Sequence, residues 1–194
     1  MIFPQHIQSS GGPISVEPAT RNDLFPLLQL FDQTVIWLIA HGLEKQWGDE
    51  LFSTSLDRHR QFLNWIDTGH FFAARLQAQL IGSLALTPGA PWYLTRRWQT
   101  FPANAFYLEA FTTSRAYAGL GLGRALLSWA ERYTLASGKT SIWLDCWADN
   151  PALVAYYQRA GFIPHEIFLV KMWRGQLFEK ALSTSRTAAN RPGT

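Results

Sequence analysis

The chain has 194 residues, of which 47% are hydrophobic and 16% charged, so it is the size of one domain and is not a disordered chain. The formal net charge is only +3 and the basic residues are dispersed, so we expect no nucleic-acid partner. A single cysteine, Cys146, and histidines without ligand spacing predict neither disulfides nor a metal. Since we find neither a long apolar span nor a signal-peptide pattern, we expect a cytoplasmic protein without membrane contact.

The N-terminal third predicts a loose arm, a strand and two helices. Residues 1–13 are polar and turn-forming, and we expect a flexible arm. A short strand over 14–20 precedes a helix over 24–41, in which apolar residues recur at helical spacing. A second helical region runs from about 49 to 66. His59 lies on its apolar side, which favours a packed histidine with a satisfied ring over a catalyst.

The middle of the chain predicts a hairpin and then a long connection. The hairpin spans 70–86 and has a Gln-Ala-Gln turn. Residues 87–105 contain three prolines, two tryptophans and the pair Arg96-Arg97, in a connection longer than most domains keep without a use. This segment is either a surface flap packed by its own aromatic residues or one wall of a substrate pocket.

The second half predicts strands over 106–114 and 141–147, a helix between them, a helix ending at Ala160, and a final strand pair. The segment 106–147 is a strand–helix–strand unit, so its strands should be parallel. We therefore predict a mixed α/β (α+β) single domain over 14–182, with a mostly antiparallel sheet of about seven strands and four helices. Residues 183–194 should be a disordered tail.

A glycine-rich turn, Gly119-Leu-Gly121-Leu-Gly123, stands between the strand and the helix of this unit. Backbone N–H groups and the positive end of a helix would meet there, as in phosphate sites. The spacing does not match G-x-G-x-x-G, because Arg124 or Leu126 stands at the third position. It does not match a P-loop either, since Gly138-Lys139-Thr140 follows a helix and no glycine stands at position 133.

The stretch Tyr117–Leu127 resembles the pyrophosphate loop of the GNAT superfamily of acyl-CoA-dependent N-acyltransferases, whose pattern is [Q/R]-x-x-G-x-[G/A]. About thirty residues later, Asn150–Phe162 resembles the family's N-x(6)-Y-x(3)-G-F motif. The resemblance covers about 14–182. One position departs from the pattern: Ala118 stands where the family has Gln or Arg, and Arg115 and Arg124 are the nearby candidates to replace that charge.

The resemblance implies an N-acetyltransferase that moves an acetyl group from acetyl-CoA, its co-substrate, to a primary amine of a small molecule or peptide, by direct attack in a ternary complex. It implies Tyr157 as the acid that protonates the departing thiolate and Glu109 as the base, with no metal. It leaves monomer or homodimer open. The coenzyme would contact Phe111, Thr112, Thr113, Ala118, Gly119, Leu120, Gly121, Leu122, Gly123, Arg124, Asn150, Leu153 and Tyr156.

Other interpretations remain open from the sequence. Tyr157 could be a core residue and Glu109 a structural carboxylate, while Asp145, within an apolar strand, is expected to be buried and paired. An acidic and aromatic rim of Trp37, Glu44, Trp47 and Asp49 would suit a cationic amine. The alternatives for the whole chain are a non-catalytic acyl-CoA-binding module, favoured by Ala118, and a nucleotide-binding protein of another fold.

Overall fold

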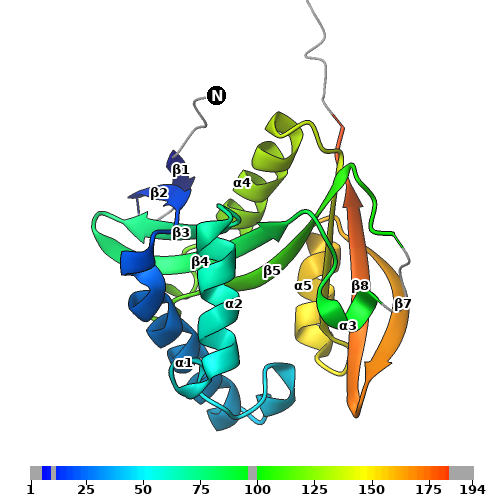
Figure 1. Cartoon of the computed structure of the whole chain (residues 1–194), viewed down its shortest axis with the longest axis horizontal. Helices are drawn as coiled ribbons and strands as arrows, with labels where there is room; N and C mark the ends of the chain where they lie inside the picture. The colour runs from blue at the N-terminus through cyan, green and yellow to red at the C-terminus, as the bar shows by residue number, and fades with distance from the viewer. Residues whose placement is uncertain (1–5, 10–11, 96–99, 184–194) are drawn as a thin grey trace, which may run out of the picture.

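The computed structural model describes residues 6–9, 12–95 and 100–183 (Figure 1). They form one eight-stranded sheet in the order β1-β2-β3-β4-β5-β6-β8-β7. All neighbouring strands are antiparallel except β5 and β6, which confirms the predicted mixed sheet and the parallel strand–helix–strand unit. The strands are β1 (His6–Ser9), β2 (Gly12–Pro18), β3 (Phe71–Leu76), β4 (Gln79–Thr87), β5 (Ala105–Thr113), β6 (Ser141–Trp147), β7 (Ile163–Val170) and β8 (Trp173–Ala181).

Strand β1 lies within the segment that the sequence assigns to a flexible arm. It pairs with β2 from His6↔Ser15 to Ser9↔Gly12, and Ile7 is buried against the apolar core. Ile7 is the one residue of this strand described as buried, so the sequence shows almost no alternation of apolar and polar residues there. The polar composition of the segment therefore gave no sign of a strand. The sheet therefore has eight strands instead of about seven. The expected tail lies outside the described residues beyond Ser183.

Helices cover both faces of the sheet, α1 (Leu24–Ala40) and α2 (Leu56–Asp67) on one and α4 (Leu122–Ala136) and α5 (Pro151–Arg159) on the other (Figure 1). A short α3 (Trp92–Thr95) lies in the long connection before β5. The face under α1 and α2 is rich in aromatic residues, with Phe31, Phe52, Phe62 and Phe71 in mutual ring contact. Burial of such rings stabilises this half of the domain through dispersion and the hydrophobic effect.

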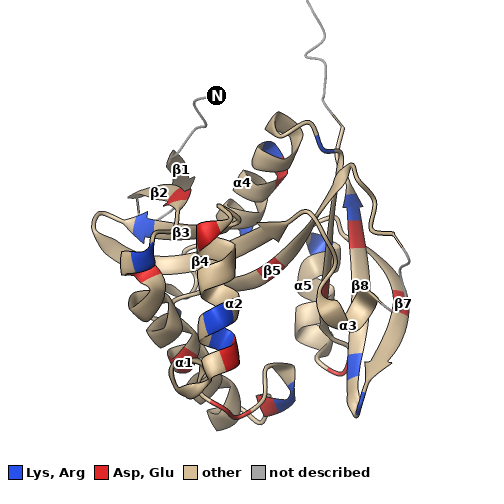
Figure 2. Ribbon diagram, viewed as in Figure 1, with Lys and Arg blue, Asp and Glu red and all other residues tan. Residues whose placement is uncertain are grey.

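One helical stretch, Arg21–Ala40, is long and apolar enough to cross a membrane by length and composition alone. Its apolar residues Leu27, Leu28, Phe31 and Val35 are at most 1% exposed, because they pack against the sheet. Packing against the sheet accounts for these residues, whereas Phe25, Ile36 and Ile39 on the same helix are exposed. Basic residues are scattered over many elements and do not gather along one of them (Figure 2).

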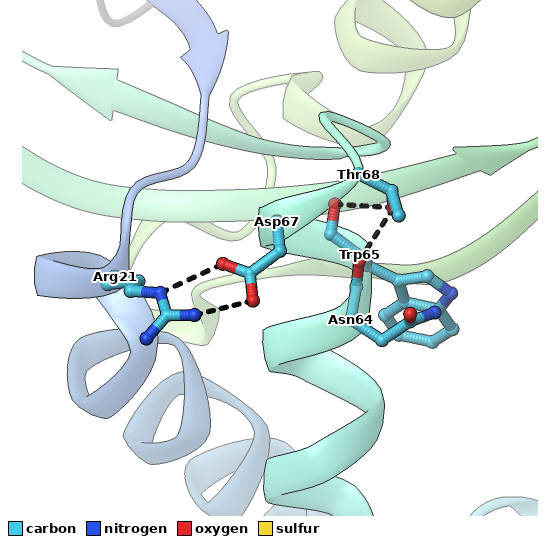
Figure 3. A network of polar contacts seen from close by, with 5 residues as sticks. All are labelled: Arg21, Asn64, Trp65, Asp67 and Thr68. Atoms are coloured by element: carbon cyan, nitrogen blue, oxygen red, sulfur yellow. Dashed lines mark hydrogen bonds and ion pairs between the residues drawn. The ribbon is translucent and has the colours of Figure 1, made fainter.

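The end of α2 is fastened to the start of α1 (Figure 3). Arg21, in the 3-10 turn before α1, donates two hydrogen bonds of 2.9 and 2.7 Å to the carboxylate of Asp67. The hydroxyl of Thr68 donates to the carbonyl oxygen of Asn64 at 2.6 Å, and the backbone N–H of Thr68 donates to the same oxygen at 3.0 Å. These contacts fix the orientation of α2, which carries Arg58 toward the sheet.

The sheet opens in its middle, between β5 and β6. These strands pair only at Ala105↔Ser141, Phe106↔Ile142 and Tyr107↔Trp143. Beyond that point β5 continues beside β4 as far as Thr113, and β6 continues beside β8 as far as Trp147. The two strands therefore separate after Tyr107 and Trp143, and the space between them is where the sequence-predicted site residues gather.

Candidate active site

The glycine-rich turn forms an anion site at the start of α4. Gly119 (φ +84°) and Gly121 (φ +70°) adopt left-handed conformations that side chains disfavour, and Gly121 is the N-cap of α4. The backbone N–H groups of Leu122, Gly123 and Arg124 have no backbone acceptor among the described residues. Together with the positive end of the helix dipole, they suit a phosphate group.

The third glycine is required by packing. A Cβ atom at Gly123 would lie 2.5 Å from the hydroxyl of Tyr156 on α5, closer than real contacts allow. That hydroxyl is buried and has no hydrogen-bond partner within the described part of the chain. The phosphate loop and α5, which the sequence assigns to one binding surface, are therefore in direct contact.

Neither Arg115 nor Arg124 simply takes the place of the Gln or Arg that the family has at the position of Ala118. Ala118 is exposed, at the end of a 3-10 turn, and Arg124 is exposed one turn into α4. Arg115 stacks on the ring of Trp37 at 3.8 Å, and Trp37 in turn stacks on His41 at 4.0 Å. This guanidinium is held toward α1, so the backbone groups are the main donors of the loop.

Two carboxylates lie where β5 and β6 separate. Glu109 and Asp145 each stand two residues beyond the last parallel pair, Tyr107↔Trp143. Since side chains alternate along a strand, both are on the face that carries Tyr107 and Trp143. Arg58 on α2 interacts electrostatically with Glu109, and Tyr93 on α3 with both carboxylates. The long connection thus places Tyr93 beside both carboxylates.

Glu109 has the properties of a general base. Burial, and next the negative charge of Asp145, raise its pKa from 4.5 to about 7. The hydroxyl of Thr87, at 3.3 Å from Oε1, and the guanidinium of Arg58 oppose that rise. A carboxylate whose pKa lies near neutrality can accept a proton at physiological pH and release it again.

Asp145 is a buried, hydrogen-bonded carboxylate, as its apolar strand predicts. The hydroxyl of Tyr93 donates to its Oδ1 at 2.9 Å, and the hydroxyl of Tyr107 donates to the same oxygen. Burial raises its pKa from 3.8 to about 6, although both tyrosine bonds favour the charged form. Burial also raises the pKa of the adjacent Cys146 thiol to about 12, so a covalent acyl-cysteine has no support.

Tyr157 is buried on α5 against Phe162 and Phe178. Burial is the largest cause that raises its pKa well above 10, with the neighbouring Cys146 next, so the phenol is neutral and can donate a proton. Asn150 is the N-cap of α5, accepting from the N–H of Leu153 at 3.1 Å and donating to Gln46 at 2.9 Å. Its side chain is therefore committed to holding α5 in place.

Other predicted cofactor residues can contribute only through part of their structure. The hydroxyl of Thr112 is bonded to that of Thr34 on α1 at 3.0 Å, because the side chain of this residue points to the α1 face, so only its main chain remains available. The side chains of Leu122 and Leu153 pack in the core behind the sheet, and Phe111 packs beside them. In the predicted aromatic rim, Trp47 is partly buried and stacks on Phe31 at the edge of the core.

Three pocket residues were not singled out from the sequence, namely Arg58, Tyr93 and Tyr107. Each is far in the chain from the carboxylate that it contacts, and none belongs to a motif. The sequence indicated them only indirectly. The connection that contains Tyr93 is unusually long, and Asp145, a carboxylate in an apolar strand, required hydrogen-bond donors. His59 matches its prediction, with its ring Nε2 2.9 Å from the carbonyl oxygen of Ser53.

Comparison with known proteins agrees with this geometry. The profile of the acetyltransferase (GNAT) family matches residues 34–162, which include the phosphate loop and the Asn150–Phe162 motif. The chain belongs to the GNAT family. A GNAT relative in Bacillus subtilis, the uncharacterized N-acetyltransferase YesJ, is 32% identical over 146 residues, covering 75% of this chain and 79% of its own. The sequence-based assignment to the family is confirmed.

Solved GNAT structures share the fold. A GNAT-family acetyltransferase from Listeria monocytogenes superposes with a TM-score of 0.71 at 24% identity, covering 91% of this chain and 99% of its own. The putative acetyltransferase yncA from Salmonella typhimurium, solved with acetyl-CoA, gives 0.63 at 16% identity and covers 88% and 95%. The GNAT chain described here is therefore an acyltransferase with the family's mixed α/β fold and an N-acetyltransferase relative.

Proposed function

We propose that this GNAT protein transfers an acetyl group from acetyl-CoA to a primary amine by direct attack in a ternary complex. The observation that carries the proposal is the separation of β5 and β6 immediately beyond Tyr107↔Trp143, with a phosphate loop after one strand and Glu109 at the opening. A site for a polyanion would hold the coenzyme, and a base at the same opening would serve the amine. Holding them together supplies much of the rate of such a reaction.

The residues present fit the coenzyme. The N–H groups of Leu122, Gly123 and Arg124 would hold the pyrophosphate, and the left-handed Gly119 and Gly121 let the backbone approach it. Strand β5 would hold the pantetheine arm through its main chain. It carries a bulge at Ala110 (φ +48°), where three steps on β5, from Glu109 to Thr112, face two on β4. A bulge releases backbone groups from the ladder, and such an N–H would polarise the thioester carbonyl.

The proton transfers are assigned to two side chains. Glu109 would take the proton that the amine loses as its nitrogen forms a bond to the thioester carbon. Tyr157 would donate a proton to the sulfur as the carbon–sulfur bond breaks, giving the free thiol and the acetylated amine. The coenzyme itself supplies an activated acetyl thioester. The neutral state of Tyr157 and the near-neutral pKa of Glu109 suit these opposite roles.

The test is turnover with a panel of primary amines, measured as release of free thiol from acetyl-CoA. We expect release that depends on the amine and exceeds hydrolysis without it, together with binding of acetyl-CoA measured by calorimetry. Binding of acetyl-CoA with no amine-dependent release would instead support a non-catalytic acyl-CoA-binding module. Tighter binding of ATP or NAD than of acetyl-CoA would refute the choice of donor.

A further inference from the structure

Asp145 is held through one carboxylate oxygen, which leaves the other oxygen for a ligand. Tyr93 and Tyr107 both donate to Oδ1, while Oδ2 receives no hydrogen bond from any described residue. The carboxylate is deep in the opening between β5 and β6, where an unpaired charged oxygen is costly. A bound group that donates to Oδ2 would remove that cost.

The charges around the opening do not cancel. Glu109 and Asp145 are the carboxylates there, and Arg58 is the cation that interacts with Glu109. The guanidinium of Arg58 lies over the ring of Phe52, 4.6 Å from its centroid, and donates to Gln61, so it is committed on its other side. Among the residues that the structure describes, one negative charge remains unbalanced there when both carboxylates are ionised. A single ammonium group would balance it, whereas a zwitterionic acceptor would not.

The wall around Asp145 is aromatic. Tyr93 and Tyr107 belong to an apolar cluster with Trp143, Phe168 and Trp173, built from the long connection and from β5, β6, β7 and β8. Aromatic faces attract ammonium groups and accept the carbon chain that an amine carries. The wall therefore suits an organic cation.

We propose that the acceptor is an aliphatic primary amine that enters as an ammonium ion and carries no carboxylate, and that Asp145 is the residue that selects it. This rests on the proposed function, since it names the class of amine that the same site takes. Glu109 accepts one proton of the bound ammonium, which frees the nitrogen lone pair for attack on the thioester carbon. The second proton that the nitrogen loses on forming the amide balances the proton that Tyr157 gives to the sulfur as the carbon–sulfur bond breaks. Asp145, anchored through Oδ1 by the two tyrosines, binds the incoming ammonium through Oδ2.

The experiment compares acceptors that differ only in a carboxylate: 2-phenylethylamine with phenylalanine, tryptamine with tryptophan, and cadaverine with lysine. With wild-type enzyme and saturating acetyl-CoA, we expect kcat/KM for the better amines to exceed that of their amino acids by about 100-fold or more, as for a charge misplaced in a buried site. Asp145→Asn should raise the KM of the amine about 10-fold or more with a smaller change in kcat, and leave the KM of acetyl-CoA unchanged.

Two further variants keep the result interpretable. Tyr93→Phe removes one bond to Oδ1 and should raise the amine KM less than Asp145→Asn does. Asp57→Asn, at the start of α2, removes a carboxylate that is 92% exposed and has only a 3.5 Å contact with Arg60, and it should change no kinetic constant. Amino acids acetylated as fast as their amines, or an unchanged amine KM in Asp145→Asn, would overturn this inference alone. If acetyl-CoA binds but no acceptor reacts, the proposed function fails as well.

Discussion

Replacement of Glu109 by Gln should stabilise the protein at alkaline pH while it abolishes most activity. The pKa of Glu109 is raised from 4.5 to about 7, chiefly by burial. Because the folded-state pKa lies above the unfolded value, the native state holds the proton more tightly, and it loses stability as pH rises through that interval. At about 1.4 kcal/mol per pKa unit, the full penalty is about 3 kcal/mol.

Some of that gain is lost in the variant, since Arg58 gives up its attraction to Glu109. We therefore expect Glu109→Gln to raise the free energy of unfolding at pH 8 by about 1 to 3 kcal/mol, with a smaller gain at pH 5, where the native carboxyl is protonated. Turnover should fall by about 100-fold or more, the usual contribution of a general base.

The measurement is urea unfolding of wild type and variant at pH 5 and pH 8, followed by fluorescence of the nine tryptophans, with amine-dependent thiol release measured in parallel. Asp57→Asn is the control for loss of an exposed carboxylate. A variant that is less stable at pH 8 than wild type, by the same amount as at pH 5, would refute the assignment of Glu109 as a buried carboxylate with a raised pKa.

Three other substitutions test separate parts of the site. Tyr157→Phe should lower kcat by about 10-fold or more with acetyl-CoA affinity nearly unchanged; unchanged kcat would leave Tyr157 a core residue. Gly121→Asp should weaken acetyl-CoA binding strongly in calorimetry, because it strains a left-handed position and places a negative charge beside the pyrophosphate; unaltered affinity would argue against the loop. Phe62→Ala should lower the free energy of unfolding by about 3–5 kcal/mol in denaturant titration, since Phe62 is 1% exposed among four aromatic rings.

Local patterns in the sequence predicted the phosphate loop and the helix behind it. Glycines at 119 and 121 are required by backbone conformation, and Asn150-Pro151 is a helix start that needs no distant partner. The alternation of apolar residues also predicted most strands. Such features depend on neighbours within a few positions, which is why they can be recognised without the fold.

The pocket itself depends on contacts that are distant in the chain. Tyr93 reaches Asp145 across 52 positions and Tyr107 reaches it across 38, and no local pattern marks either pair. The raised pKa of Glu109 results from burial by elements that converge from the whole chain, so the sequence could name the carboxylate but not its proton affinity. The contact between Trp47 and Phe31 likewise has no local pattern that marks it in the sequence.

The three residue pairs that join β5 to β6 have a mechanical consequence. Among the described strands, β5 and β6 pair only from Ala105 to Tyr107, so few backbone hydrogen bonds join the two halves of the sheet. The side chains packed between the sheet and α4 must therefore hold the two halves in place. That layer is apolar: Leu108 of β5, Leu126 of α4 and Leu144 of β6, in which the two strand residues lie beyond the last pair, belong to one cluster. The volume of these side chains thus sets the distance between β5 and β6 beyond their last pair. A substitution that leaves a cavity there should weaken the binding of both substrates before it unfolds the domain.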